Sequence, residues 1–299
     1  KNTLIMRFLI IFIFSIIPFH AFADDTNKAK KNILDNMSTG ISSALENFIG
    51  GEGDTEVQIV TGEDYHPEFS IMTVRPLATH PGVDAWFVQL QLNDTKIRGK
   101  GRLSTNLGVG YRKLSESKNS FTGANLFIDY DAEGNARSSV GLELRSSAFE
   151  VIANYYQALS GSVTVGSYSE RSLDGSDISI VGEIPYLPWA SIIANHYEWK
   201  ANKNSKSSKG DKLSLELAIT PSLIVDIGYD DNNIHGTSNF AKIMFVYPPR
   251  ERVTATTNLV GENAFSQIDM SDELLSKVRR SNKQIIESEG TGVVMARSN

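Results

Sequence analysis

Two residue types that often carry catalysis are scarce in this chain, since histidine is rare and cysteine is absent. Its five histidines are scattered along 299 residues, and neither a Ser/His/Asp order nor an HExxH helix is present. The chain contains no cysteine, so a disulfide framework is excluded. Its net charge of −6 gives no general attraction to nucleic acid. We therefore predict no catalytic residue, no enzyme and no nucleic-acid partner.

Two short motifs begin like ligand-binding loops but lack a required residue. "DYDAEGN" (129–135) starts like a calcium loop, yet its twelfth position is Val140 and not Glu. We interpret it as an exposed turn built on Gly134-Asn135. "GVG" (108–110) is not followed by the residues of a phosphate-binding loop. The sequence therefore predicts no metal ion and no cofactor.

From about residue 56 onward, apolar and polar residues alternate with a period of two, and the segments with this pattern carry the remaining polar residues. Between 139 and 145, for example, Val140, Leu142 and Leu144 alternate with small or charged residues. Helical periodicity is absent from this region, and the pattern is typical of an all-β protein with hairpin connections. About twelve such segments are present, namely 56–63, 68–76, 86–92, 103–111, 124–130, 139–145, 149–156, 176–184, 191–199, 213–219, 223–229 and 241–247.

A secreted β-sandwich and an outer-membrane β-barrel both produce alternating strands. Two features favour the barrel. The polar face combines glycines with charged residues, as a hydrated barrel interior does. Aromatic residues also gather at strand ends, where the two membrane interfaces of a barrel would lie. The predicted membrane-interface aromatics are Trp86, Tyr111, Tyr130, Tyr155, Trp189, Tyr229 and Tyr247.

The polar face of these strands is expected to line the interior of a closed barrel, because an open sheet edge cannot be satisfied in hydrocarbon. Its charged members could line a conducting pore, or they could form a network that holds another segment. We favour the network, since charges inside barrels are normally paired. The predicted lumen-facing polar residues are Asn106, Asn125, Asp129, Glu143, Arg145, Glu150, Asn154, Asp226 and Lys242.

The N-terminus predicts export. Met6-Arg7 precedes an apolar run of roughly ten residues and an A-x-A site at 21–23, the pattern of a secretory signal peptide over 1–23. The apolar run is shorter than the ~20 residues of a membrane-spanning helix. Residues 1–5 precede the first Met, and we expect them to lie outside the native chain. Residues 24–54 follow as a periplasmic segment, helical over 27–50, although an amphipathic helix on the membrane surface is the alternative.

The connections between the predicted strands fall into two groups. Short ones occur at 146–147, 185–189 and 221–222, and longer polar ones occur at 158–175, 200–210 and 230–238. Short inner turns and long outer loops are the asymmetry of outer-membrane barrels. In the inner connection at 185–189, proline ends a strand and Trp189 is expected at the level of the lipid headgroups.

Four stretches resemble the translocator domain of inverse autotransporters, the intimin and invasin family. They are "NLGVGYR" (106–112), "GANLFIDYD" (123–131), "VGLELRSSAFEVIANYYQALSG" (140–161) and "ERSLDGSDISIVGEIPYLPW" (170–189). The resemblance extends from about residue 30 to 288. It implies a single 12-stranded antiparallel transmembrane β-barrel over 55–248 with a short periplasmic helix before it. It also implies a linker that enters the pore and carries a C-terminal passenger to the cell surface.

The pore linker of the family falls within 249–299 here. Ser271 is a candidate helix cap, followed by acidic residues, so a helix over 271–287 is predicted; at ~1.5 Å per residue it would span roughly 25 Å. "VRRSNKQIIE" (278–287) resembles the stretch that enters the lumen, with a solvated periplasmic helix as the alternative. The predicted linker residues are Leu274, Val278, Arg279 and Arg280.

The sequence departs from the family pattern at its C-terminal end, where about ten residues follow Gly290 and no passenger is seen, so adhesion is not predicted. Three hypotheses remain: a translocator of type V secretion with its linker in the pore, a small porin-like channel, and an outer-membrane enzyme. The expected location is the bacterial outer membrane. The expected partners are outer-membrane lipid, the outer-membrane assembly machinery and periplasmic chaperones, and the chain is expected to be a monomer.

Overall fold

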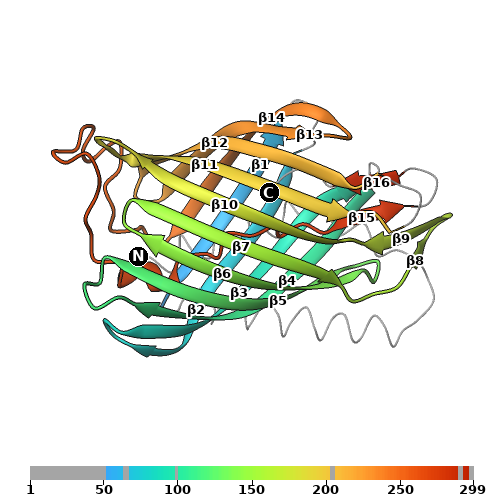
Figure 1. Ribbon diagram of the computed structural model, residues 1–299, viewed down its shortest axis with the longest axis horizontal. Helices are drawn as coiled ribbons and strands as arrows, with labels where there is room; N and C mark the ends of the chain where they lie inside the picture. Colours follow the sequence, from blue (N-terminus) through green and yellow to red (C-terminus); the bar gives the residue numbers. More distant parts are fainter. Residues whose placement is uncertain (1–51, 63–66, 98–99, 203–205, 289–291, 296–299) are drawn as a thin grey trace, which may run out of the picture. The chain divides into compact units, whose positions relative to one another are not determined.

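The computed structural model describes residues 52–62, 67–97, 100–202 and 206–288, and the backbone of 292–295. Twelve of its strands form one closed antiparallel barrel (Figure 1). The predicted signal peptide and the predicted helix over 27–50 lie outside the described residues. No helix in the described part of the chain is long and apolar enough to span a membrane.

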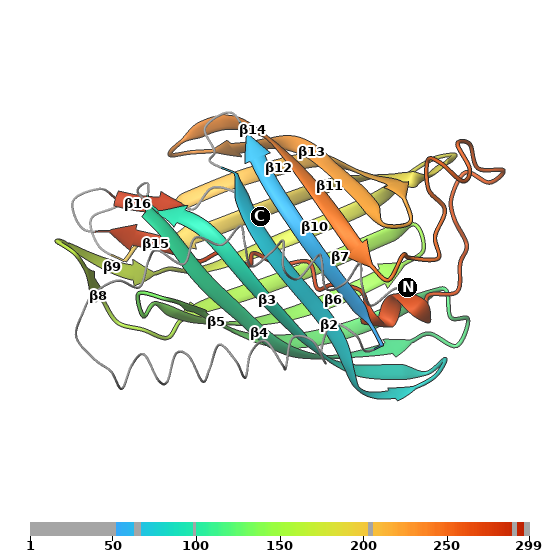
Figure 2. The same ribbon diagram turned by 180° about the vertical axis from the view of Figure 1, so that it is seen from behind.

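Each barrel strand pairs with its neighbour in sequence, except that β7 pairs with β10 and that β1 pairs with β14 to close the barrel (Figure 2). All twelve segments predicted from the period of two lie on these strands, except that residue 63, the last of the first segment, is outside the described residues. The strands are β1 (Asp54–Gly62), β2 (Glu68–His80), β3 (Asp84–Ile97), β4 (Lys100–Leu114), β5 (Ser120–Asp131), β6 (Ala136–Ser146), β7 (Phe149–Ala158), β10 (Asp174–Ile184), β11 (Leu187–Lys200), β12 (Ser208–Thr220), β13 (Leu223–Asn232) and β14 (Gly236–Tyr247).

The barrel is polar inside and apolar outside. In β6, Leu142 faces outward and is 63% exposed, whereas its neighbour Glu143 faces inward and is 4% exposed. The same alternation runs through β3 to β7. An outer surface of exposed Leu, Ile and Val is unfavourable in water but favourable against lipid. The all-β fold and the lipid-facing barrel predicted from the sequence are therefore confirmed.

The two ends of the barrel differ. The inner end is defined here as the end where β1 begins, β14 ends and the short turns lie; in outer-membrane barrels such turns face the periplasm. Tight turns at 147–148, 185–186 and 221–222 join strands there. The predicted inner connection at 185–189 is shorter than expected, because β11 already begins at Leu187.

Two connections at the outer end contain more strand than the sequence suggests. The predicted loop at 230–238 is mostly strand, since β13 continues to Asn232 and β14 begins at Gly236. The predicted loop at 158–175 contains two short strands, β8 (Val163–Val165) and β9 (Tyr168–Ser172). Polar residues suggested loops here, but the inward face of these strand ends is polar too, with Asp230, Asn232 and Ser238 buried.

A second, four-stranded sheet lies at the outer end. It contains β8, β9 and two strands from the C-terminal tail, β15 (Ile285–Ser288) and β16 (Gly292–Met295), in the order β16-β15-β9-β8 (Figure 1). The tail leaves β14 at the inner end, yet it pairs with β9 at the outer end. Residues between these two points therefore have to traverse the barrel.

A charge on the outer face tests the assignment of that face to lipid. We expect Leu142→Arg to destabilise the barrel by about 2–4 kcal/mol in phospholipid vesicles, because a guanidinium would enter the hydrocarbon. Gln157→Arg, on an exposed outward position near the outer end of β7, should cost only about 0–1 kcal/mol. Urea titration of the vesicle-inserted variants measures both. Equal and negligible effects would mean that Leu142 faces water.

Candidate functional site: a basic tail segment inside the barrel

The tail first follows the inner rim before it enters the barrel. Residues 250–270, here called the rim strap, form backbone hydrogen bonds with successive inner turns. The Arg250 N–H donates to Pro221 O at 2.9 Å, the Gly261 N–H to Tyr186 O at 2.8 Å, and the Met270 N–H to Lys118 O at 2.8 Å. The Ser147 hydroxyl donates to Ser266 O at 2.7 Å. The strap thus passes the β12–β13, β10–β11, β6–β7 and β4–β5 turns in that order.

The β10–β11 turn is built to hold this strap. Tyr186 has a positive φ of 64°, which is uncommon for a residue with a side chain. Both of its backbone polar groups bond to the strap, because its N–H donates to Ala264 O and its carbonyl accepts from Gly261. The indole N–H of Trp189 donates to Leu259 O at 2.9 Å. Trp189, predicted to be a headgroup-level aromatic, therefore lies at the rim and also fixes the strap.

A short apolar plug follows the strap at the inner mouth of the barrel. A 3-10 helix, η2 (Asp272–Leu275), follows it at the inner mouth. Leu274 and Met270 pack in one buried cluster with Ala85, Leu114 and Phe121 of the wall. Ser271, the predicted helix cap, makes no capping bond; its hydroxyl and its N–H both donate to Asp269, which lowers the pKa of the Asp269 carboxyl below its usual value.

The predicted helix over 271–287 is wrong, because only η2 is helical. Residues 276–284, here called the lumen segment, run extended through the barrel. At ~3.3 Å per residue this stretch spans ~30 Å, about the thickness of the hydrocarbon, whereas a helix of the same length would span only ~14 Å. An extended chain also frees its backbone for the wall. A helix would have used the same groups internally.

The wall uses those freed backbone groups. Five wall side chains donate to carbonyls of the tail: Arg112 to Leu274 O and Ser276 O, Arg145 to Lys277 O, Asn154 to Arg279 O, Arg137 to Ser281 O, and Asn106 to Asn282 O, at 2.5–3.1 Å. In return the Val278 N–H donates to Gln89 Oε1 at 2.8 Å, and the Ser281 N–H donates to Tyr156 Oη at 2.7 Å. The wall therefore recognises the backbone of the lumen segment.

The charges of the tail and the wall are complementary. The lumen segment carries four basic residues and no acidic one. Each base meets a carboxylate of the wall. The five ion pairs are Lys277 with Glu56 at 2.8 Å, Arg279 with Glu150 at 2.8 Å and Glu216 at 2.9 Å, Arg280 with Asp129 at 2.8 Å, and Lys283 with Glu68.

Because the segment is extended, its bases pair with carboxylates on several sides of the barrel. Consecutive side chains of an extended chain point in opposite directions. Arg279 therefore reaches Glu150 of β7 and Glu216 of β12, while Arg280 reaches Asp129 of β5. Lys277 reaches the closing pair of strands, because its Nζ contacts Glu56 of β1 and lies 3.2 Å from Met244 Sδ of β14. One short segment thus connects separate parts of the barrel wall.

A repeated unit of glycine, aromatic ring, arginine and carboxylate shapes the wall. At Gly108 a methyl group would overlap the ring of Phe127, so the absent side chain makes room for that ring. The guanidinium of Arg280 lies 4.3 Å from the centre of the Phe127 ring and pairs with Asp129. A cation over an aromatic face is stabilised by the ring quadrupole.

The same unit occurs twice more with an arginine of the wall. Gly110 accommodates Phe87, Arg112 lies 4.4 Å above that ring, and Glu143 binds Arg112 at 2.7 Å. Gly175 accommodates Trp199, and Arg137 lies 5.3 Å above that ring and binds Asp129. Arg112 and Arg137 were not predicted from the sequence. Extending the alternation to the ends of β4 and β6 would have placed both on the inward face.

The structure places every predicted lumen residue inside the barrel. Asn106, Asp129, Arg145, Glu150 and Asn154 contact the tail directly. Glu143 binds Arg112 and Arg145 instead, Asp226 and Lys242 pair with each other at 2.9 Å, and Asn125 lies against Gly141. Eight of these nine residues thus have a hydrogen-bonded or ionic partner inside the barrel, and the Asn125 amide has none among the described residues.

The predicted interface aromatics lie near the ends of their strands. Trp86 and Tyr111 contact each other near the inner end, with ring centres 4.9 Å apart, and Tyr247 ends β14 there. The remaining three lie near the outer end on the outward face, namely Tyr130, Tyr155 and Tyr229. Their contact with headgroups stays a prediction.

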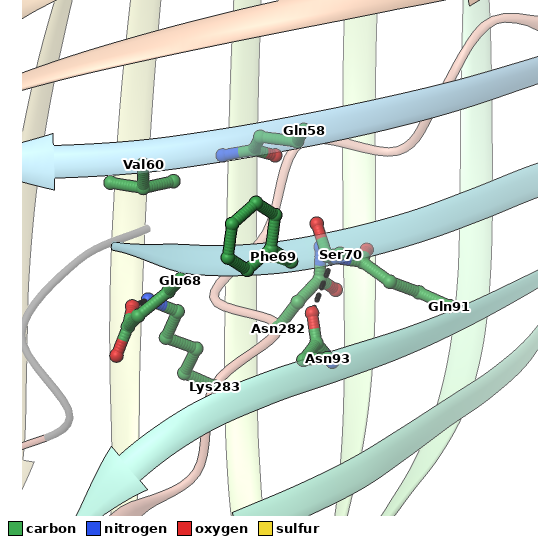
Figure 3. Close-up of a pocket in the computed structure, with 9 residues that line it drawn as sticks. All are labelled: Gln58, Val60, Glu68, Phe69, Ser70, Gln91, Asn93, Asn282 and Lys283. Atoms are coloured by element: carbon green, nitrogen blue, oxygen red, sulfur yellow. Dashed lines mark hydrogen bonds and ion pairs between the residues drawn. The ribbon is translucent and has the colours of Figure 1, made fainter. Parts of the chain in front are cut away.

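A small cavity lies beside the lumen segment near the outer end. A cavity of about 30 Å³ remains between β1, β2, β3 and residues Asn282 and Lys283 (Figure 3). This volume holds about one water molecule. Within it the Gln91 side-chain amide donates to Asn93 Oδ1 at 2.6 Å, and Gln91 Oε1 is a buried acceptor without a hydrogen-bond partner among the described residues.

The family model described as "Inverse autotransporter, beta-domain" matches residues 17–282. The chain belongs to this family. The inverse autotransporter β-domain is a bacterial outer-membrane barrel and not a known class of enzyme. The family resemblance and the outer-membrane location predicted from the sequence are therefore confirmed. A comparison with curated proteins gives no match.

One solved structure shares the fold of this inverse autotransporter barrel. The chain reported under "Unveiling the Mechanism Behind the in-meso Crystallization of Membrane Proteins" is 20% identical, with a TM-score of 0.64 over 79% of this chain and 99% of that chain. The KdgM porin is 7% identical, with a TM-score of 0.44 over 64% of this chain and 98% of that chain. The first likeness concerns the fold alone, and the second is too distant to support any inference.

Removing one tail arginine tests whether the buried pairs hold the inverse autotransporter barrel together. We expect Arg280→Leu to lower the free energy of unfolding by about 3–5 kcal/mol, because it leaves a buried carboxylate without one of its two bases. Lys113→Leu, which removes an exposed base at the inner rim, should change it little. Denaturant titration of the refolded variants gives both values. Identical midpoints would show that the pairs are energetically neutral.

Proposed function

We propose that this barrel is a translocator that keeps a C-terminal segment of its own chain threaded through its pore and anchored there. One observation supports this proposal above the others: four bases of the lumen segment meet carboxylates of the wall. A pore that served only to conduct would gain nothing from a wall whose acidic residues are matched to one particular peptide.

The anchoring combines three kinds of contact along the tail. The apolar plug at Leu274 resists movement at the inner mouth, and the ion pairs resist it in the middle. At the outer mouth the backbone of β15 pairs with β9, and the Leu173 N–H donates to Ile285 O at 3.0 Å. A segment fixed in this way would carry anything joined to its C-terminal end on the cell surface. Insertion by the outer-membrane assembly machinery, with the help of periplasmic chaperones, belongs to the same proposal.

The alternative is a small porin-like channel, and conductance distinguishes it from the proposed function. We expect the intact chain to be closed in planar bilayers and a variant lacking 268–299 to conduct. The opened pore should select cations, because Glu56, Glu68, Glu150 and Glu216 lose their bases on the tail. The reversal potential in a KCl gradient measures this selectivity.

A second variant tests whether the pore opens when the ion pairs are lost but the tail residues remain. Arg279→Glu combined with Arg280→Glu keeps the full tail but places like charges opposite Glu150, Glu216 and Asp129. It should show openings that the intact chain lacks, whereas Lys113→Glu should stay closed. Equal conductance in the intact chain and in the variant without 268–299 would exclude the plug and favour the channel.

A further inference from the structure

The rim strap displays large apolar side chains that nothing in the described part of the chain covers. Leu259 and Val260 are each 62% exposed, Phe265 is 49% exposed and Ile268 is 44% exposed. Only one charged residue, Glu262, lies between 257 and 268. Exposed apolar groups that gather in one segment mark a contact surface rather than ordinary solvent exposure.

This exposure is imposed by the structure. The strap is hydrogen-bonded to the β10–β11 hairpin at Leu259 itself, through the indole of Trp189, and just after Val260, where the Gly261 N–H donates to the Tyr186 carbonyl. On the C-terminal side of Phe265, Ser266 is held by Glu183 and Ser147. The bonded backbone fixes the apolar side chains, so they cannot withdraw from the surface by a local rearrangement.

The neighbours of these side chains belong to the inner edge of the lipid-facing surface. Gly261 of the strap packs against Pro188 of β11. Tyr186 at the adjacent turn is 51% exposed, and Phe149 at the inner end of β7 is 46% exposed on the outward face. The apolar part of the strap therefore lies beside the inner edge of the barrel surface that contacts lipid. Amphipathic and aromatic residues are favoured at this level of a membrane.

We propose that the rim strap is a membrane-surface anchor whose Leu259, Val260, Phe265 and Ile268 insert into the inner leaflet of the outer membrane. The partner is a phospholipid surface, recognised by apolar burial and by the low charge of the segment. The anchor fixes the point at which the tail turns into the pore. It does not depend on whether the lumen segment carries a passenger.

The absence of cysteine from the sequence makes a site-specific test direct. Leu259→Cys and Phe265→Cys are each labelled with the fluorophore NBD and inserted into phosphatidylethanolamine/phosphatidylglycerol vesicles with or without nitroxide-labelled phospholipid. Leu142→Cys on the lipid-facing side of β6 is the lipid reference, and Glu133→Cys in the outer turn is the water reference. Resistance to unfolding in SDS without heating establishes that each variant is folded.

We expect the labels at 259 and 265 to emit at shorter wavelength than the label at 133. We also expect lipid nitroxide to quench the labels at 259 and 265 to the extent typical of sites near the headgroups. Their quenching should be closer to that of the label at 142 than to that of the label at 133. Emission and quenching like those of the label at 133 would overturn the proposal. Short-wavelength emission without nitroxide quenching would overturn it too, because protein and not lipid would then cover these side chains.

Discussion

The need to bond every backbone group inside a membrane governs this structure. Hydrocarbon offers no partner to an open strand edge, so β1 has to meet β14 and the sheet has to close. Closure assigns the outward face to lipid and collects the polar residues in a narrow interior. There a charge has no bulk water and is stable only beside an opposite charge. The acidic residues of the wall therefore require bases, and the tail brings four of them.

The unit of glycine, ring, arginine and carboxylate explains how so many guanidinium groups fit into this interior. Without a side chain at Gly108 or Gly110, an aromatic ring can lie flat against the wall. The flat ring then offers its face to an arginine, and a carboxylate holds the edge of the guanidinium. Each unit buries a charge at a fixed height in the barrel, which gives the lumen segment defined positions to bind.

The sequence predicted the wall better than the tail, for a physical reason. Strand alternation is local: Leu142 and Glu143 reveal opposite environments from adjacent positions. The conformation of the tail is not local. Ser271, Asp272 and Glu273 are good signals for the start of a helix, and one 3-10 turn does form there. Beyond it, donors such as Arg112 and Asn106, more than a hundred residues earlier in the chain, outweigh the helix preference by binding the tail carbonyls. The rim strap carries no periodic signal, because turns on four hairpins determine its path.

Arg280 shows why the tail is best regarded as part of the barrel and not as a ligand of it. It occupies the same kind of position on Phe127 that Arg112 occupies on Phe87, and it shares Asp129 with Arg137 of the wall. Asp129 thus has one base from the wall and one from the tail, and its site is complete only when both are present. A wall designed to be empty would have balanced its own charges. This one leaves carboxylates on β1, β2 and β12 whose bases arrive from residues 277–283, so the folded state of the barrel interior already includes the chain that passes through it.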